Sequence, residues 1–234
     1  MENINCDPLP FGSEDLQMSE SLRIELRRHL ADLKEKYLQR GWGTRMGWGT
    51  RPAVIVIDLA NYWLRNSVAT GSTLDSVVEA TVSVLDAARR AGCPILFTTL
   101  DWDPAFPETP QNRKLKWDVS DDGEGDLFEL DDRLNRQPDE MIIRKRFASA
   151  FKGTALSEIL ASLDIDTLVV CGVSTSHCVY ATCRDAVDSM RVIVPEEAVG
   201  ERCEVMHTVN LLDMDIDIAD VTPLEEVLAQ LAAL

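Results

Sequence analysis

A cysteine in the second half of the chain has the surroundings of a nucleophile. Cys178 lies in the run Cys-Gly-Val-Ser-Thr-Ser-His-Cys-Val at residues 171–179, where an apolar strand is expected to break at Gly172 and a helix to begin almost at once. The N–H groups and partial positive charge of a helix N-terminus favour thiolate over thiol, and they can receive an oxyanion. A buried structural cysteine is the alternative, because free cysteines are among the most buried residues.

Two more ionisable residues stand directly after apolar runs. Asp58 follows Val-Ile-Val-Ile at residues 54–57, where poor solvation makes a carboxylate a better base. Its alternative role is to cap the next segment. Lys145 follows a shorter run and stands between Arg144 and Arg146, so a solvated basic cluster is the alternative there. Strand alternation turns neighbouring side chains to opposite faces, but the pattern does not say which one faces inward.

A base, a cation and a thiol at one end of a sheet can form an activated-nucleophile site. His177 suggests a different partner for Cys178. Adjacent residues on a helix point about 100° apart, however, so a Cys–His pair is disfavoured. Spacing alone does not decide between the three-residue site and the structural alternatives.

The three residues can meet only if the strands before them share one sheet. Apolar, β-branched runs predict strands at 53–57, 94–99, 140–143, 167–171, 191–194 and 216–219. Helical periodicity lies between and after them, at 74–91, 156–163, 177–190, 201–212 and 223–234. Such alternation is typical of a parallel sheet covered on both faces, which binds its ligands beyond the carboxyl ends of the strands.

The first 51 residues are expected to stand apart from this α/β pattern. Residues 14–38 carry leucines at near-helical spacing among many charges, which predicts an amphipathic helix that could pack on a neighbouring subunit. The repeat Gly-Trp-Gly-Thr-Arg at 41–45 and 47–51 indicates a linker with two aromatic anchors, Trp42 and Trp48. We therefore divide the chain into an extension, 1–51, and an α/β domain, 52–234.

The charge and composition of the chain indicate which kinds of molecule it could bind and where in the cell it could work. The net charge of −17 would repel phosphate backbones, so a nucleic-acid partner is not expected and small solutes are favoured. The sequence has no apolar run of the roughly 20 residues that a membrane-spanning helix needs. The absence of a secretory signal and the scattered spacing of the six cysteines favour a cytoplasmic protein. The acidic run 118–140 is interpreted as a solvated loop.

Three segments together resemble the isochorismatase-like cysteine hydrolases. They are Val-Ile-Asp-Leu around Asp58, Lys-Arg-Phe-Ala-Ser-Ala-Phe-Lys-Gly-Thr from Lys145, and the run that ends at Cys178. The likeness covers roughly residues 40–234. Within the family, the doubled Gly-Trp-Gly linker and the acidic tail at 210–221 look most like the N-carbamoylsarcosine and maleamate amidohydrolases. The expected fold is a three-layer, Rossmann-like α/β fold with a six-stranded, mostly parallel sheet in the order 3-2-1-4-5-6.

The resemblance implies an Asp58–Lys145–Cys178 triad, and its register selects Lys145 from the basic cluster. It also implies a cis peptide at Val173–Ser174, which would aim the N–H groups of Ser174 and Cys178 at an oxyanion. The implied reaction is hydrolysis of a small amide or ureido C–N bond through a thioester, with release of ammonia.

The resemblance also suggests residues that would contact the substrate. Arg202 stands where relatives bind a substrate carboxylate, although a solvated surface arginine is equally compatible with the sequence. Asn61, Trp63 and Trp102 follow the first two strands and could line the pocket, although tryptophans are as often part of the core.

Related nicotinamidases hold a metal near the second strand, where this chain has Asp101-Trp-Asp103. Its three histidines, His29, His177 and His207, are distant from that pair in sequence. We therefore predict no metal and no cofactor. Two alternatives remain open, a nicotinamidase-like amidase and a non-catalytic scaffold, and a homo-oligomer, dimer or tetramer, is expected.

Overall fold

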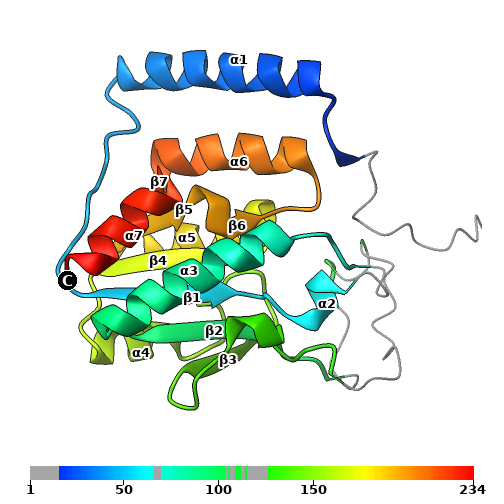
Figure 1. Cartoon of the computed structure of the whole chain (residues 1–234), viewed down its shortest axis with the longest axis vertical. Helices are drawn as coiled ribbons and strands as arrows, with labels where there is room; N and C mark the ends of the chain where they lie inside the picture. Colours follow the sequence, from blue (N-terminus) through cyan, green and yellow to red (C-terminus); the bar gives the residue numbers. More distant parts are fainter. Residues whose placement is uncertain (1–15, 66–69, 104, 106–108, 112–113, 115–125) are drawn as a thin grey trace, which may run out of the picture.

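The protein is built around one parallel sheet with helices on both faces (Figure 1). The computed structural model describes residues 16–65, 70–103, 105, 109–111, 114 and 126–234. Six strands are hydrogen-bonded in the order β3-β2-β1-β4-β5-β7, and a short strand, β6, pairs with β4. The strands are β1 Pro52–Ile57, β2 Ile95–Leu100, β3 Met141–Lys145, β4 Thr167–Val173, β5 Arg191–Pro195, β6 Val199–Gly200 and β7 Asp220–Thr222.

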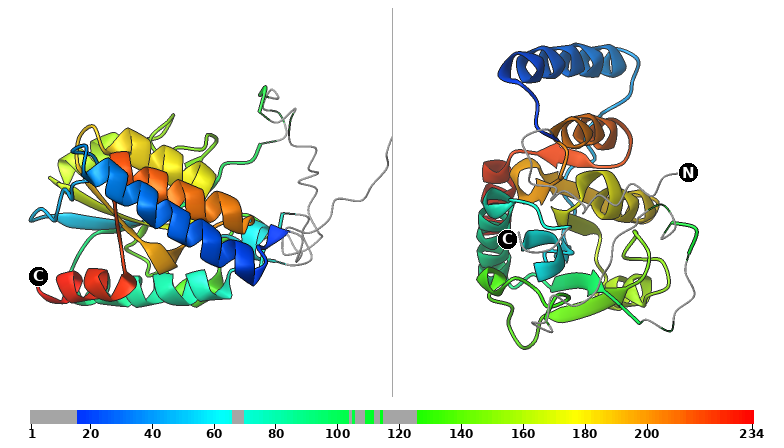
Figure 2. Two further views of the ribbon diagram at one scale, coloured as in Figure 1. Left: turned by 90° about the horizontal axis from the view of Figure 1, so that it is seen from above. Right: turned by 90° about the vertical axis from the view of Figure 1, so that its right-hand side faces the viewer.

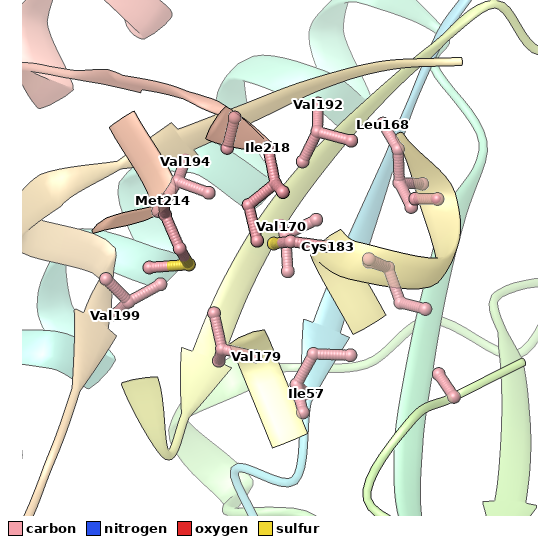
Figure 3. Packing of buried hydrophobic residues seen from close by; sticks show 14 of the residues in the cluster. Ile57, Leu168, Val170, Val179, Cys183, Val192, Val194, Val199, Met214 and Ile218 are labelled. Atoms are coloured by element: carbon pink, nitrogen blue, oxygen red, sulfur yellow. The ribbon is translucent and has the colours of Figure 1, made fainter. Parts of the chain in front are cut away.

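Strand alternation divides the core between the two faces. Ile55 and Ile57 of β1 face α4 (Leu156–Ser162), α5 (Tyr180–Ala186) and α6 (Glu204–Asp217). Figure 3 shows Met214 and Ile218, at the end of α6, among the valines of β4 and β5. The alternate residues, Val54 and Val56, face α3 (Asp75–Ala91) and α7 (Leu224–Ala232). The sheet is thus buried on both sides, as its continuous apolar strands predict.

The expected strand order is confirmed, with two corrections. A seventh strand, β6, is too short to give a sequence signal. The strand expected at 216–219 is wrong, because α6 runs through Asp217 and the sheet resumes only at Asp220. The buried residues Leu211, Met214 and Ile218 recur at helical spacing, and this pattern prevails over the local alternation of Asp and Ile.

Helix α1 (Glu20–Leu38) lies against α6, away from the sheet (Figures 1 and 2). Its expected start at Glu14 lies outside the described residues, and Ser19 caps its N-terminus by accepting from the N–H of Leu22. None of its residues is buried. Two ion pairs, Arg23–Glu204 and Lys34–Asp215, attach it to α6.

The linker is anchored through its second repeat. Trp48 packs against the core on the α3 face, but Trp42 is 54% exposed, so only one of the two expected aromatic anchors is present. The carboxylate of Asp166 accepts hydrogen bonds from the N–H groups of Thr50 and Arg51 and so fixes the chain where it enters β1. In the part of the chain that the structure describes, no helix has the length and apolar character needed to cross a membrane.

Strand β4 does not break at Gly172 as expected but continues through it to Val173. Gly172 has φ +110°, and a Cβ there would lie 2.0 Å from the carbonyl oxygen of Ile57 on β1. The close approach of β1 and β4 therefore requires glycine at this position.

Replacement of Gly172 by alanine should destabilise the fold, because it combines positive φ with a backbone clash. We expect a loss of about 3 kcal/mol or more in the free energy of unfolding, measured by urea denaturation. Gly92→Ala is the control: Gly92 ends α3 with φ +69° and has no atom within 4 Å of an added Cβ. Its loss should stay near 1–2 kcal/mol. Equal losses in the two variants would contradict the steric explanation.

Candidate active site

The three residues singled out by the sequence meet at the carboxyl edge of the sheet. Asp58 follows β1, Lys145 ends β3, and Cys178 lies in the π-helical turn Thr175–Val179 after β4. This turn is called the Cys178 turn below. The strand order reverses between β1 and β4, which is where open α/β sheets bind their ligands.

Asp58 is held in an unusual backbone conformation by the neighbouring strand. Its φ is +52°, in the left-handed region that residues other than glycine rarely adopt. The hydroxyl of Thr98, on β2, accepts from the N–H of Asp58 at 3.1 Å and donates to its Oδ1 at 2.6 Å. Thr98 is fully buried and was missed by sequence reasoning, although a polar residue inside an apolar strand is a usable signal.

Lys145 is the inward-facing member of the basic cluster. Its Nζ lies 2.7 Å from Oδ2 of Asp58, and it is only 3% exposed. The flanking arginines turn away from this pair: Arg144 reaches Glu129 at 3.5 Å, and Arg146 donates to Asp101 at 2.6 Å. Burial alone would lower the pKa of Lys145, but the charges of Asp58 and Cys178 outweigh it and the net shift is upward.

Cys178 faces the Asp58–Lys145 pair and is hydrogen-bonded to both side chains. The expected cis peptide, Val173–Ser174, precedes its turn. The carbonyl of Ser174 accepts from the N–H groups of His177 and Val179, at 2.9 and 3.2 Å, so the turn closes tightly around Cys178. The imidazole Nδ1 of His177 lies 3.0 Å from the hydroxyl of Ser176.

The resting protonation of Cys178 differs from the sequence expectation. Burial and the Asp58 carboxylate raise the pKa of the thiol to about 12, and the opposing effect of Lys145 is smaller. Burial and the Asp58 charge thus act against the thiolate that the helix N-terminus is expected to favour. Near neutral pH Cys178 is a thiol, with its potential base already in contact.

Tyr62, on α2 (Asn61–Leu64), is a further buried neighbour that sequence reasoning missed. Burial raises the pKa of its phenol, and the charges of Asp58 and Cys178 add to the shift, while Arg202 acts against it. The Tyr62 phenol is thus coupled electrostatically to Asp58 and Cys178 and, in the opposite sense, to Arg202.

The four residues expected to contact substrate, Arg202, Asn61, Trp63 and Trp102, have different kinds of neighbour. Arg202 lies on the loop before α6, not at the start of a helix, with Nη1 3.7 Å from Oε1 of Glu201. Asn61 donates through Nδ2 to the carbonyl of Asp126 at 3.0 Å. The two tryptophans have aromatic neighbours, and contact with substrate stays a prediction for all four residues.

Trp63 packs against the core on the α3 face and meets Tyr62 edge to face, with ring centroids 4.8 Å apart. Trp102 is 45% exposed, and its ring stacks on Phe128 at 6.3 Å. Trp102 is thus the more accessible of the two tryptophans.

Asp101, which the resemblance to nicotinamidases marks as a possible metal position, has a different partner. Asp101 forms its ion pair with Arg146. Among the described residues, no group of three or more His, Cys, Asp or Glu side chains is arranged to bind a metal ion. The absence of a metal requirement stays a prediction.

Comparison with known proteins shows the family of this chain. Residues 52–226 match the Isochorismatase domain. The chain belongs to this family. It is 34% identical to an N-carbamoylsarcosine amidase from Arthrobacter over 205 residues, which cover 85% of this chain and 78% of the relative. It is 31% identical to a maleamate amidohydrolase from Pseudomonas putida over 194 residues, 81% of this chain and 91% of the relative.

A solved structure shares the fold. A cysteine hydrolase from Pseudomonas syringae pv. phaseolicola superimposes with a TM-score of 0.74 at 24% identity, covering 81% of this chain and 98% of that chain. The family and the amidohydrolase relatives place this isochorismatase-family chain among hydrolases of carbon–nitrogen bonds other than peptide bonds.

The contact between Asp58 and Cys178 gives a testable property of the thiol. Asp58→Asn removes the negative charge that raises the pKa of Cys178, so the pKa of the thiol should fall. The alkylation rate of Cys178 should then rise at least about tenfold at pH 8, since each unit of pKa changes the thiolate fraction tenfold. The rate is followed by mass spectrometry of the Cys178 peptide after treatment with iodoacetamide.

The wild-type rate should increase with pH up to at least pH 10 without a plateau. Asp101→Asn is the matched control, because Asp101 lies at the same sheet edge but pairs with Arg146. An unchanged Cys178 rate in Asp58→Asn would show that the carboxylate does not govern the thiol.

Proposed function

We propose that this family member is a cysteine-dependent amidohydrolase that cleaves a small amide or N-carbamoyl bond and releases ammonia. The observation that carries the proposal is the contact of one thiol with a buried carboxylate and a buried ammonium group, 2.7 Å apart. A thiol with a pKa of about 12 needs a base in contact in order to attack at neutral pH, and Asp58 is that base.

The proposed reaction has two halves. In the first, Asp58 takes the proton of Cys178 while the sulfur attacks the carbonyl carbon. The C–N bond then breaks, Asp58 returns the proton to the leaving nitrogen, and a thioester remains. In the second half, Asp58 takes a proton from water while the water oxygen attacks the thioester carbon. The C–S bond then breaks, Asp58 returns the proton to the sulfur, and the acid leaves as the thiol is restored. Lys145 stabilises the anionic states through its fixed positive charge.

The N–H groups of Ser174 and Cys178 are proposed to bind the oxyanion of each tetrahedral intermediate. Ser174 is buried and follows the cis peptide, and Cys178 lies in the turn that begins directly after Ser174. Donors fixed before the reaction need no rearrangement as charge develops.

The proposed substrate is a small amide that carries a carboxylate. Two supports are the electrostatic influence of Arg202 on Tyr62 and the names of the two amidohydrolase relatives. A guanidinium group binds a carboxylate through two parallel hydrogen bonds, which gives orientation as well as affinity. Asn61, Trp63 and Trp102 are proposed to line the same pocket.

Three expectations extend the proposal. The enzyme is proposed to work without a metal, in contrast to a nicotinamidase-like alternative. It is proposed to act in the cytoplasm as a homo-oligomer, in which α1, without a buried residue of its own, packs on a neighbouring subunit. The non-catalytic scaffold alternative is disfavoured because a scaffold has no need of a buried base–cation–thiol cluster.

Cys178→Ser should fold normally and lose at least about a thousandfold in rate, because a serine hydroxyl is a far weaker nucleophile in this setting. Ammonia release is measured over N-carbamoyl amino acids, maleamate, biuret and nicotinamide. Cys171→Ala and Cys183→Ala are controls for the loss of a buried thiol elsewhere in the core. Near wild-type turnover by Cys178→Ser would exclude the covalent route.

The assay is repeated with the wild-type protein after prolonged chelation, and activity should be unchanged. Activity that is lost on chelation and then restored by zinc would favour the nicotinamidase-like alternative.

Arg202→Ala should lower kcat/KM on a carboxylate-bearing amide by about ten- to a hundredfold, the usual effect of losing a charge-assisted hydrogen bond of roughly 1.5–3 kcal/mol. Arg202→Lys keeps the charge but loses the planar fork, so it should recover only part of the loss. An uncharged amide serves as the reference substrate. Equal losses on both substrates would mean that Arg202 supports the fold, and the carboxylate would be dropped from the proposal.

A further inference from the structure

Glu201 is a buried carboxylate that the proposed reaction does not use. It stands between β6 and α6, next to Arg202, and its side chain is only 1% exposed. A buried charge is costly unless hydrogen bonds replace its water. The partners of Glu201 therefore indicate what this charge holds in place.

Both carboxylate oxygens of Glu201 have donors, and the donors come from two different segments. Oε2 accepts from the N–H of Ser176 at 2.9 Å and from its hydroxyl at 2.5 Å. Oε1 accepts from the N–H of Arg202 at 2.9 Å and lies 3.7 Å from Nη1 of the same residue. One side chain thus joins the Cys178 turn to the loop that carries Arg202.

A second contact runs parallel to the first. The hydroxyl of Thr175 donates to the carbonyl of Gly200 at 3.0 Å and lies 2.9 Å from Nδ1 of His207 on α6. Two successive residues of the Cys178 turn are therefore bound to Gly200, the last residue of β6, and to Glu201, which follows it. Ser176 is two positions before Cys178, so the place of the sulfur depends on these contacts.

We propose that Glu201 is a positioning residue that sets the Cys178 turn and Arg202 in register with each other. The inference rests on the proposed function, because it assigns the two ends of one reacting substrate to these two segments. The scissile carbonyl must reach the sulfur while the substrate carboxylate reaches the guanidinium group. A misplacement of about 1 Å can cost roughly a hundredfold in rate, so a rigid link between the two contacts has a direct catalytic effect.

Glu201→Gln tests the link with little change of shape. The amide keeps one oxygen acceptor, but its NH₂ group cannot accept from an N–H, so either Ser176 or Arg202 loses its partner. We expect kcat on a carboxylate-bearing amide to fall at least about tenfold. We also expect iodoacetamide to alkylate Cys178 at least about threefold faster at pH 8, because the freed turn exposes the thiol.

Glu140→Gln is the matched control. Glu140 is also buried, but its partner is Arg89, at 2.8 Å, on the α3 side of the fold. This variant should lose stability without changing kcat or the alkylation rate of Cys178. If Glu201→Gln behaves in the same way, with kcat and alkylation within twofold of wild type, Glu201 only stabilises the fold and the proposal is overturned.

Two arrangements keep the outcome decisive. If Glu201→Gln does not fold, Ser176→Ala replaces it. This variant loses the hydroxyl contacts with Glu201 and His177 but keeps the N–H contact with Glu201. It should lower kcat about three- to tenfold, and an unchanged kcat would overturn the proposal. Alkylation needs no substrate. Faster alkylation in Glu201→Gln therefore supports the positioning role even if the wild-type chain hydrolyses no amide, a result that would overturn only the proposed function.

Discussion

The buried ion pair between Asp58 and Lys145 is the interaction on which the rest of the site depends. Both groups lie almost entirely out of water, where the cost of desolvation is repaid only if each charge keeps its partner. Loss of one partner from such a pair typically costs about 3–5 kcal/mol, because the other charge is left buried and alone. The pair therefore fixes the ends of β1 and β3 relative to each other and leaves Cys178 facing two opposite charges of known position.

The parallel sheet brings these charges together without any local sequence signal for the contact. All strands end at the same edge, and β1 lies between β2 and β4, so residues that follow β1, β3 and β4 converge. Gly172 lets β4 approach β1 closely just before the chain turns toward Cys178. The sheet thus keeps the strand ends in fixed positions. The Cys178 turn, which is hydrogen-bonded to Glu201, orients the sulfur.

The sequence predicts the parts of this arrangement that depend on local pattern. Asp58 could be found because it follows a continuous apolar strand, whereas the choice of Lys145 from the basic cluster and the order of the sheet follow from the family resemblance. The strand expected at 216–219 was wrong because a short alternation of Asp and Ile fits both a strand and the last turn of a buried helix.

Contacts between distant segments were beyond sequence reasoning. Thr98 is 40 residues from Asp58, and Glu201 is 25 residues from Ser176, so neither pairing leaves a mark in the surrounding residues. The upward shift of the Cys178 pKa was not predicted, for a related reason. It depends on the balance among burial, one carboxylate and one ammonium group, and that balance exists only once the sheet has formed.

The ion pairs that attach α1 to α6 and the buried charges around Cys178 differ in their exposure to solvent. The pairs Arg23–Glu204 and Lys34–Asp215 lie at the surface between two helices, where mobile ions can approach them. At an ionic strength of about 0.1 M, charges in solvent are screened over roughly 10 Å, whereas charges without solvent around them are screened far less. Added salt therefore weakens the attachment of α1 to α6, but it leaves the electrostatic field at Cys178 nearly unchanged.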